Sequence, residues 1–200
     1  MAAPTGTTVD QTDRIPDPAA GHWTEERFLG LPTDRRRVEL LDGALLVSPN
    51  PARPHQRLSF RLCALLDGAR PDDVEVLEAV NVRLGPERIL IPDLAVVTLV
   101  DSDGVTCEAS ETRLVVEILG PNRRRTGEAV KPALYAAAGI PHYLRIDLGP
   151  DGPEATAYAL SDGRYRETVR ARPGERLCLT EPIVLDVGLA ALLAAGRLPG

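Results

Sequence analysis

Two short stretches decide the fold: IPDLAVV, residues 91–97, and LVVEIL, residues 114–119. Both have the length of a β-strand and are rich in Val, Ile and Leu, a pattern typical of strands that are covered on both faces. Each contains one acid, Asp93 in the first and Glu117 in the second. A buried carboxylate must be paired, bound to a metal or neutralised. Asp93 and Glu117 are therefore candidates for a shared cation site.

A single lysine follows these strands. Lysine and arginine together number 23, and Lys131 is the only lysine among them. An ammonium is a compact donor whose pKa shifts readily with its surroundings, whereas a guanidinium stays protonated. Taken alone, one lysine in an arginine-rich chain is equally well explained by drift. Because it follows two strand acids, Lys131 is a candidate catalytic residue. Tyr135 lies four residues further along and is expected on the same face of the helix.

The length and composition indicate a single soluble domain. Residues 1–21 combine Pro, Thr, Asp and Gly with little apolar content and are expected to form a disordered tail. Residues 22–195 are then expected to form a single domain. We see no signal peptide and no apolar run long enough to span a membrane, so a cytoplasmic protein without a membrane partner is expected. The three cysteines are widely spaced, so we expect them to be reduced rather than to form disulfides or a zinc site.

The charges and aromatic residues limit the classes of partner. A net charge of −6 argues against coating nucleic acid through bulk positive charge, although it says little about a local patch. Two arginine triples, Arg35 to Arg37 and Arg123, Arg124, Arg125, could form such a patch; solvated turns explain the first triple equally well and the second less well. Aromatic residues make up 4%, so stacking platforms for single strands are not expected. No Walker loop, dinucleotide-binding glycine pattern or G-x-S-x-G motif is present, so neither a nucleotide cofactor nor a serine hydrolase is expected.

Local patterns predict the order of helices and strands. Caps, Pro and Gly positions and helical spacing predict helices at 25–29, 54–67, from about 128–131 to 139 with Pro132 in the first turn, and at 189–195. Asp42-Gly43 predicts a hairpin of strands 37–41 and 44–47. Further strands are expected at 74–84 (one strand or a bent pair), within 89–99, at 114–119 and at 141–148, followed by an antiparallel meander at 155–160, 165–171 and 177–185. Residues 101–112 are expected to form an exposed loop.

With these residues in view, the chain resembles the PD-(D/E)XK nuclease superfamily and, within it, the bacterial restriction endonuclease group often labelled Uma-type. The resemblance covers roughly residues 24–147. It is carried, in chain order, by VELLDG at 38–43, Ser48-Pro49, His55-Gln56, Pro92-Asp93, VEIL at 116–119, Lys131 to Tyr135, and AGIPHY at 138–143.

The resemblance implies a fold and a site. The fold would be α/β, with a restriction-endonuclease-like mixed central β-sheet flanked by helices. Asp93 and Glu117 would bind the metal together with the backbone carbonyl of Ile118, and Glu39 would be a third acid nearby. Lys131 would replace the lysine that relatives carry on the strand at the position of Leu119. Tyr135 would stand beside it, and His55 is either a surface residue or an auxiliary site residue.

The implied activity is a Mg²⁺- or Mn²⁺-dependent hydrolysis of DNA phosphodiesters by an endonuclease. A homodimer is expected by analogy, because cutting two strands suits two sites. Relatives usually carry a serine, an aspartate and a tryptophan where this chain has Gly120, Gly127 and a residue near Leu144. The alternative is therefore a nuclease-fold DNA-binding or regulatory protein with weakened or absent activity. In a purely structural alternative, Asp93 lies at a turn, Glu117 pairs with an arginine and Lys131 lies on a solvated face.

Overall fold

The fold is described from a computed structural model over residues 21–31, 37–100, 104–120 and 126–194. Some predicted features lie outside these residues: nearly all of the amino-terminal tail, and Arg123, Arg124 and Arg125. Within them the chain forms helices α1 to α4 and strands β1 to β13. No helix among them combines the length and apolar character that a membrane span requires.

A six-stranded sheet forms the centre of the molecule, in the order β11-β10-β9-β8-β6-β3. Strands β8 and β9 are parallel and the other neighbours are antiparallel. Helix α3, Thr126–Ala137, connects the parallel pair. The strands are β3 Val74–Glu78, β6 Leu94–Thr98, β8 Thr112–Leu119, β9 His142–Gly149, β10 Gly152–Ser161 and β11 Arg164–Ala171. The predicted mixed sheet is confirmed. Of the predicted meander, the first two strands form the antiparallel pair β10 and β11, whereas the third segment lies in a separate two-stranded sheet.

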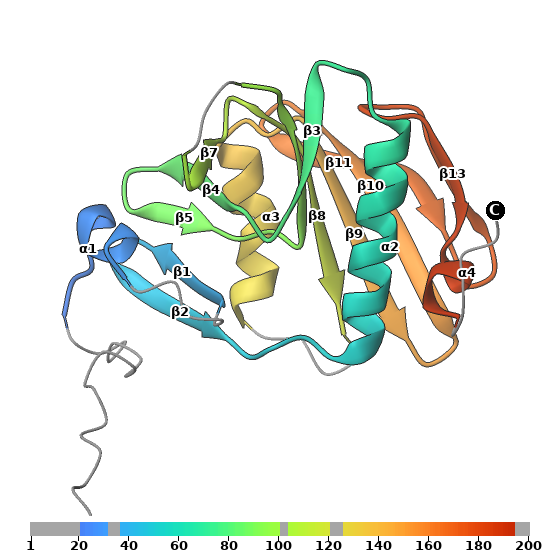
Figure 1. Cartoon of the computed structure of the whole chain (residues 1–200), viewed down its shortest axis with the longest axis horizontal. Coiled ribbons are helices and arrows are strands. Elements are labelled where there is room, and N and C mark those ends of the chain that lie inside the picture. The colour runs from blue at the N-terminus through green and yellow to red at the C-terminus, as the bar shows by residue number, and fades with distance from the viewer. Residues whose placement is uncertain (1–20, 32–36, 101–103, 121–125, 195–200) are drawn as a thin grey trace, which may run out of the picture.

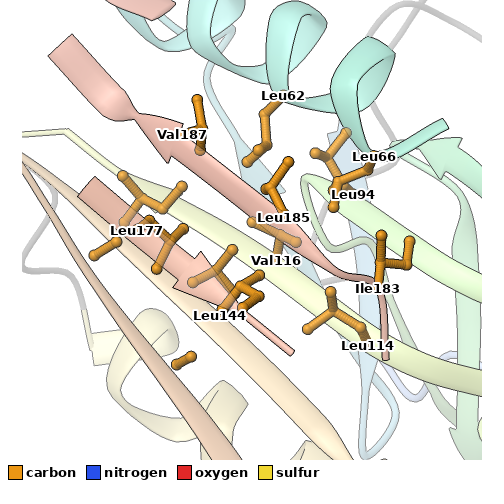
Figure 2. Close-up of a cluster of buried hydrophobic side chains, with 14 of the residues drawn as sticks. Leu62, Leu66, Leu94, Leu114, Val116, Leu144, Leu177, Ile183, Leu185 and Val187 are labelled. Carbon is orange, nitrogen blue, oxygen red and sulfur yellow. The ribbon is translucent and has the colours of Figure 1, made fainter. Parts of the chain in front are cut away.

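Helices α2 and α3 cover opposite faces of this sheet (Figure 1). Helix α2, Arg53–Ala69, packs through Leu58, Leu62 and Leu66 on a core shared with the carboxy-terminal elements. These elements are β12 Arg176–Leu179, β13 Leu185–Gly188 and α4 Leu189–Leu193. In Figure 2, Leu62 of α2 points toward this core, in which Leu185 of β13 and Val116 of the central sheet also lie. Burial of these aliphatic side chains holds the carboxy-terminal part onto the central sheet.

The other face carries α3 and a second sheet. Tyr135 of α3 and Tyr143 of β9 are buried there with Val115. The second sheet has the order β2-β1-β5-β4-β7. Its strands are β1 Arg37–Leu41, β2 Ala44–Ser48, β4 Asn81–Gly85, β5 Arg88–Leu90 and β7 Thr106–Glu108, and α1 Glu25–Leu29 precedes it. Trp23 and Phe28 pack with Leu40 of β1 in a third small core.

Several predicted boundaries are wrong for physical reasons. The segment 74–84 forms β3 and β4, which belong to different sheets. The strand expected within 89–99 breaks between β5 and β6, so Asp93 directly precedes a strand, consistent with Pro92 lacking an N–H for a sheet ladder. The loop 101–112 contains β7, and 177–185 divides between β12 and β13. Helix α3 begins at Thr126, which places Pro132 beyond the first turn.

Candidate functional site

Strand pairing brings the two predicted metal-binding acids together. Strands β6 and β8 are antiparallel, with Leu94 opposite Val116. Asp93 precedes Leu94 and Glu117 follows Val116, so the register makes the two acids neighbours across the pair. The backbone N–H of Ile118 donates a hydrogen bond to Asp93 Oδ2 at 2.6 Å, which fixes the Asp93 carboxylate beside β8. Both acids are buried.

Lys131 points into the same cluster from α3. Its Nζ lies 2.7 Å from Glu39 Oε1 and 3.1 Å from Glu117 Oε1. It also donates to the carbonyl oxygen of Ile91 at 3.4 Å. The side chain is only 10% exposed, so the alternative in which Lys131 lies on a solvated face is wrong.

Tyr135 and Glu39 complete this half of the site. The Tyr135 hydroxyl donates to Glu117 Oε1 at 2.6 Å, as expected for a side chain one helical turn from Lys131. Glu39, on β1, accepts a hydrogen bond from the Ile91 N–H at 2.7 Å. One acid from each sheet therefore contacts the lysine, and the segment that begins at Ile91 lies between them.

Arg37 is a site residue that the sequence reasoning missed. Its Nη1 donates to Asp93 Oδ1 at 2.5 Å, and its Nη2 donates to the carbonyl oxygen of Ile91 at 2.6 Å. The side chain is 16% exposed. The sequence reasoning had considered Arg37 only as part of an arginine triple, either a basic patch or a solvated turn, and the other two arginines lie outside the described residues. One signal was available: Arg37 precedes Glu39 by two residues, and the alternation of a strand places both side chains on one face.

His55 approaches Asp93 from the first turn of α2. Its Nε2 lies 3.2 Å from Asp93 Oδ2. Neither ring nitrogen has a well-aligned hydrogen-bond partner among the described residues. The ring is buried, which favours the auxiliary role for His55 over that of a surface residue.

The two acids experience opposite electrostatic environments. Burial alone would raise the pKa of Asp93, but His55 and Arg37 outweigh it and hold that pKa well below its usual range. Burial raises the pKa of Glu117, and repulsion from Asp93 and Glu39 adds to this despite the attraction of Lys131. The neighbours of Asp93 thus outweigh the effect of its burial, whereas those of Glu117 do not.

The basic and phenolic groups keep their protons. Burial acts to lower the pKa of Lys131, but Glu117 and Glu39 outweigh it and the pKa is raised. The pKa of Arg37 is also raised, because Asp93, Glu117 and Glu39 outweigh its burial. Burial together with Glu117 raises the pKa of Tyr135 well above its usual value. Lys131 is therefore an ammonium that can orient or neutralise, not a base.

The cluster fits a cation by charge and by donor type. The carboxylates of Glu39, Asp93 and Glu117 face two permanent cations, Arg37 and Lys131, so that with His55 counted as neutral the formal charges leave one negative charge in excess. Carboxylate oxygens are the ligands that Mg²⁺ prefers. Within the described residues no three His, Cys, Asp or Glu side chains are already arranged around one metal position. Arg37 and Lys131 instead pair with carboxylate oxygens of Asp93, Glu39 and Glu117 that would otherwise be available to a metal ion.

A cleft of ≈ 560 Å³ opens beside this cluster. Arg37, His55 and Asp93 contribute to its lining, together with the amino-terminal half of α2 and the end of β3. Gly120 follows β8, and a Cβ added there would meet no heavy atom of the described residues within 4 Å. The hydroxyl that relatives carry at this position could therefore be accommodated.

The fold and the acid-lysine cluster together define a nuclease-like protein. A model of the Uma2 family, described as putative restriction endonuclease, matches residues 25–191. The chain belongs to this family, as the resemblance indicated. None of the curated proteins matches the chain.

A crystal structure of a putative nuclease belonging to DUF820 from Anabaena variabilis has a similar fold. The two superpose with a TM-score of 0.70 at 16% sequence identity, over 86% of this chain and 99% of that one. This similarity supports the mixed α/β fold.

Proposed function

We propose that the protein is a metal-dependent endonuclease that hydrolyses phosphodiester bonds in DNA. The observation that carries this proposal is the buried cluster of Glu39, Asp93 and Glu117 around Lys131, with one negative charge in excess. The raised pKa of Glu117 means that its ionised carboxylate costs the folded state stability, and a divalent cation would offset that charge and accept the oxygen donors of the cluster.

Asp93, Glu117 and the backbone carbonyl of Ile118 would hold Mg²⁺ or Mn²⁺, with Glu39 as a further acid. The metal would polarise the phosphodiester and lower the pKa of a bound water. Lys131 stays protonated, so it would orient the attacking water or offset charge in the transition state. The Tyr135 hydroxyl fixes the Glu117 carboxylate. Arg37 lines the cleft with a planar guanidinium, which suits two oxygens of one phosphate.

Plasmid cleavage tests this proposal directly. Purified protein is incubated with supercoiled DNA and Mg²⁺ or Mn²⁺, beside Asp93→Asn and Lys131→Ala, and Mn²⁺ binding is measured by calorimetry. We expect each substitution to slow cleavage by roughly a hundredfold or more, because each removes a charge from the reacting centre. Asp151→Asn, at an exposed acid in the turn before β10, is the matched control and should leave the rate unchanged. Cleavage that survives in Asp93→Asn would contradict the assignment.

A second candidate is a nuclease-fold protein that binds DNA without cutting it. Two observations favour it: Gly120 lacks the hydroxyl of relatives, and Arg37 and Lys131 already engage the acids. Gly120→Ser separates the two candidates, since the added side chain meets open space. A cutting enzyme should retain or gain turnover in this variant. DNA binding without turnover in both the wild type and Gly120→Ser would support the second candidate.

We further propose a homodimer that presents two such sites to the two DNA strands. Sedimentation velocity with and without duplex DNA measures the oligomeric state. A monomer under both conditions would contradict it.

A further inference from the structure

The cleft beside Asp93 is larger than one metal ion requires. Its volume of ≈ 560 Å³ falls within the range of about 300–1,000 Å³ that is usual for sites binding small organic groups. Its lining includes the buried Asp93 and the largely buried Arg37 as well as the exposed Gln56 and Phe60 of α2. The cleft is therefore continuous with the proposed catalytic cluster but extends beyond it.

Phe60 is the one exposed aromatic residue of the described chain. The sequence contains two Phe, four Tyr and one Trp, and all seven lie within the described residues. Trp23, Phe28, Tyr135 and Tyr143 are buried, and the remaining two tyrosines stack against Tyr143. Phe60 is 68% exposed and lines the cleft. An exposed aromatic ring that lines a cleft offers a face on which a flat ligand can stack.

Polar groups accompany this ring along α2. Arg53, Gln56 and Phe60 are spaced three and four residues apart, so they share one helix face, and all three are exposed. His55 adds a buried ring whose two nitrogens have no well-aligned hydrogen-bond partner in the described part of the chain, and it also lines the cleft. Gln56 and Phe60 thus give the cleft an amide for a base edge and a ring for a base plane, and Arg53, outside the cleft lining, offers a cation to a neighbouring phosphate.

We propose that this cleft holds one unpaired nucleotide of the substrate, with its base stacked on Phe60 and its phosphate directed toward Arg37 and Asp93. The inference rests on the proposed nuclease function and deepens it, because it names the substrate class. A base within a duplex has both faces covered by its neighbours, so only an unpaired or extruded base can stack on a protein ring. The favoured substrates are therefore DNA with unpaired bases: single strands, frayed ends, flaps and the strand-separated regions of a supercoiled plasmid. The low aromatic content argued against an extended stacking platform, but a single base needs a single ring.

Binding without cleavage tests the cleft separately from the chemistry. The probes are a 12-nucleotide single strand with one 2-aminopurine and a blunt duplex of the same sequence, both in Ca²⁺ instead of Mg²⁺. Phe60→Leu keeps an apolar side chain and removes the π-face, whereas Phe60→Trp keeps the π-face. Val105→Ala changes another exposed apolar residue, 65% exposed and outside the cleft lining, and serves as the control.

We expect Phe60→Leu to weaken single-strand binding about five- to a hundredfold, the effect of losing one stacked base. Quenching of 2-aminopurine should disappear in Phe60→Leu and return in Phe60→Trp. Duplex affinity should change by less than about twofold, and Val105→Ala should match the wild type for both probes. Equal binding by Phe60→Leu and the wild type would overturn the proposal, as would an equal loss for strand and duplex.

The two proposals fail in different ways. Single-strand binding that depends on the Phe60 ring, without cleavage in Mg²⁺ or Mn²⁺, would support the cleft and contradict the nuclease. Metal-dependent cleavage with unchanged binding in Phe60→Leu would support the nuclease and overturn the cleft.

Discussion

Asp93 and Glu117 are adjacent acids with opposite contributions to stability. The lowered pKa of Asp93 means that its ionised form stabilises the fold above its usual pKa of 3.8, and that this stability is lost as the pH falls through the lower folded value. The raised pKa of Glu117 has the opposite sign. Its ionisation costs the folded state stability as the pH rises above the usual value of 4.5.

Substitution of each acid by its amide should therefore give opposite results in metal-free buffer with EDTA. Glu117→Gln removes the uncompensated charge and keeps an oxygen for Tyr135 and Lys131, so its Tm at pH 7 should equal or exceed that of the wild type. This difference should shrink toward pH 4. Asp93→Asn leaves Arg37 without its buried partner and should cost about 3 to 5 kcal/mol. Thermal unfolding from pH 4 to 8 measures both, and a Glu117→Gln variant as unstable as Asp93→Asn would contradict the assignment.

At the level of elements, the β1–β2 hairpin positions two of the site residues. Arg37 and Glu39 are on β1, whose register with β2 depends on the turn at Asp42 and Gly43. Both turn residues have positive φ angles, 49° and 78°, as the predicted Asp-Gly turn requires. A Cβ at Gly43 would also lie 2.2 Å from His22 Nδ1. The hairpin at Asp162 and Gly163 has nearly the same backbone, with φ angles of 50° and 73°, and open space around Gly163.

This pair of turns provides a matched comparison. Gly43→Ala and Gly163→Ala should each cost about 1 to 2 kcal/mol, because each forces a left-handed conformation on a residue with a Cβ. Only Gly43→Ala should weaken Mn²⁺ binding, since only its hairpin carries Glu39. Chemical unfolding gives the stabilities and calorimetry the Mn²⁺ affinity. Equal Mn²⁺ affinities in the two variants would show that the hairpin does not position the site.

At the scale of the whole molecule, the carboxy-terminal elements form part of the main core. Leu177 of β12 is fully buried in the cluster that includes Leu62 of α2 and Leu144 of the central sheet. We expect Leu177→Ala to lower the free energy of unfolding by about 2 to 5 kcal/mol, through lost burial and the cavity left behind. Val184→Ala, at a side chain 73% exposed, should change it by no more than about 0.5 kcal/mol. Urea unfolding measures the free energy of unfolding of both variants. If the carboxy-terminal part were only loosely attached, both values would match that of the wild type.

Local sequence signals predicted much of the fold. The Thr24 cap of α1, the Asp42-Gly43 hairpin and the apolar strand around Glu117 were each predicted near their observed positions, because a cap, a two-residue turn and a buried strand depend on neighbouring residues. The family resemblance added the mixed sheet. Strand partners were harder to predict. Nothing local shows that β3 and β4, separated by only Ala79 and Val80, join different sheets.

By itself the sequence determined the candidate chemistry: two acids in apolar strands, Glu39 in a hairpin strand and a lone lysine four residues before a tyrosine. Only the tertiary structure decided that Lys131 is buried between Glu39 and Glu117, that Arg37 pairs with Asp93, and that Phe60 stays exposed beside the cleft. The reason is physical. Residue type and spacing fix which charges and rings exist, whereas long-range packing decides which of them lose their water and which neighbours compensate them.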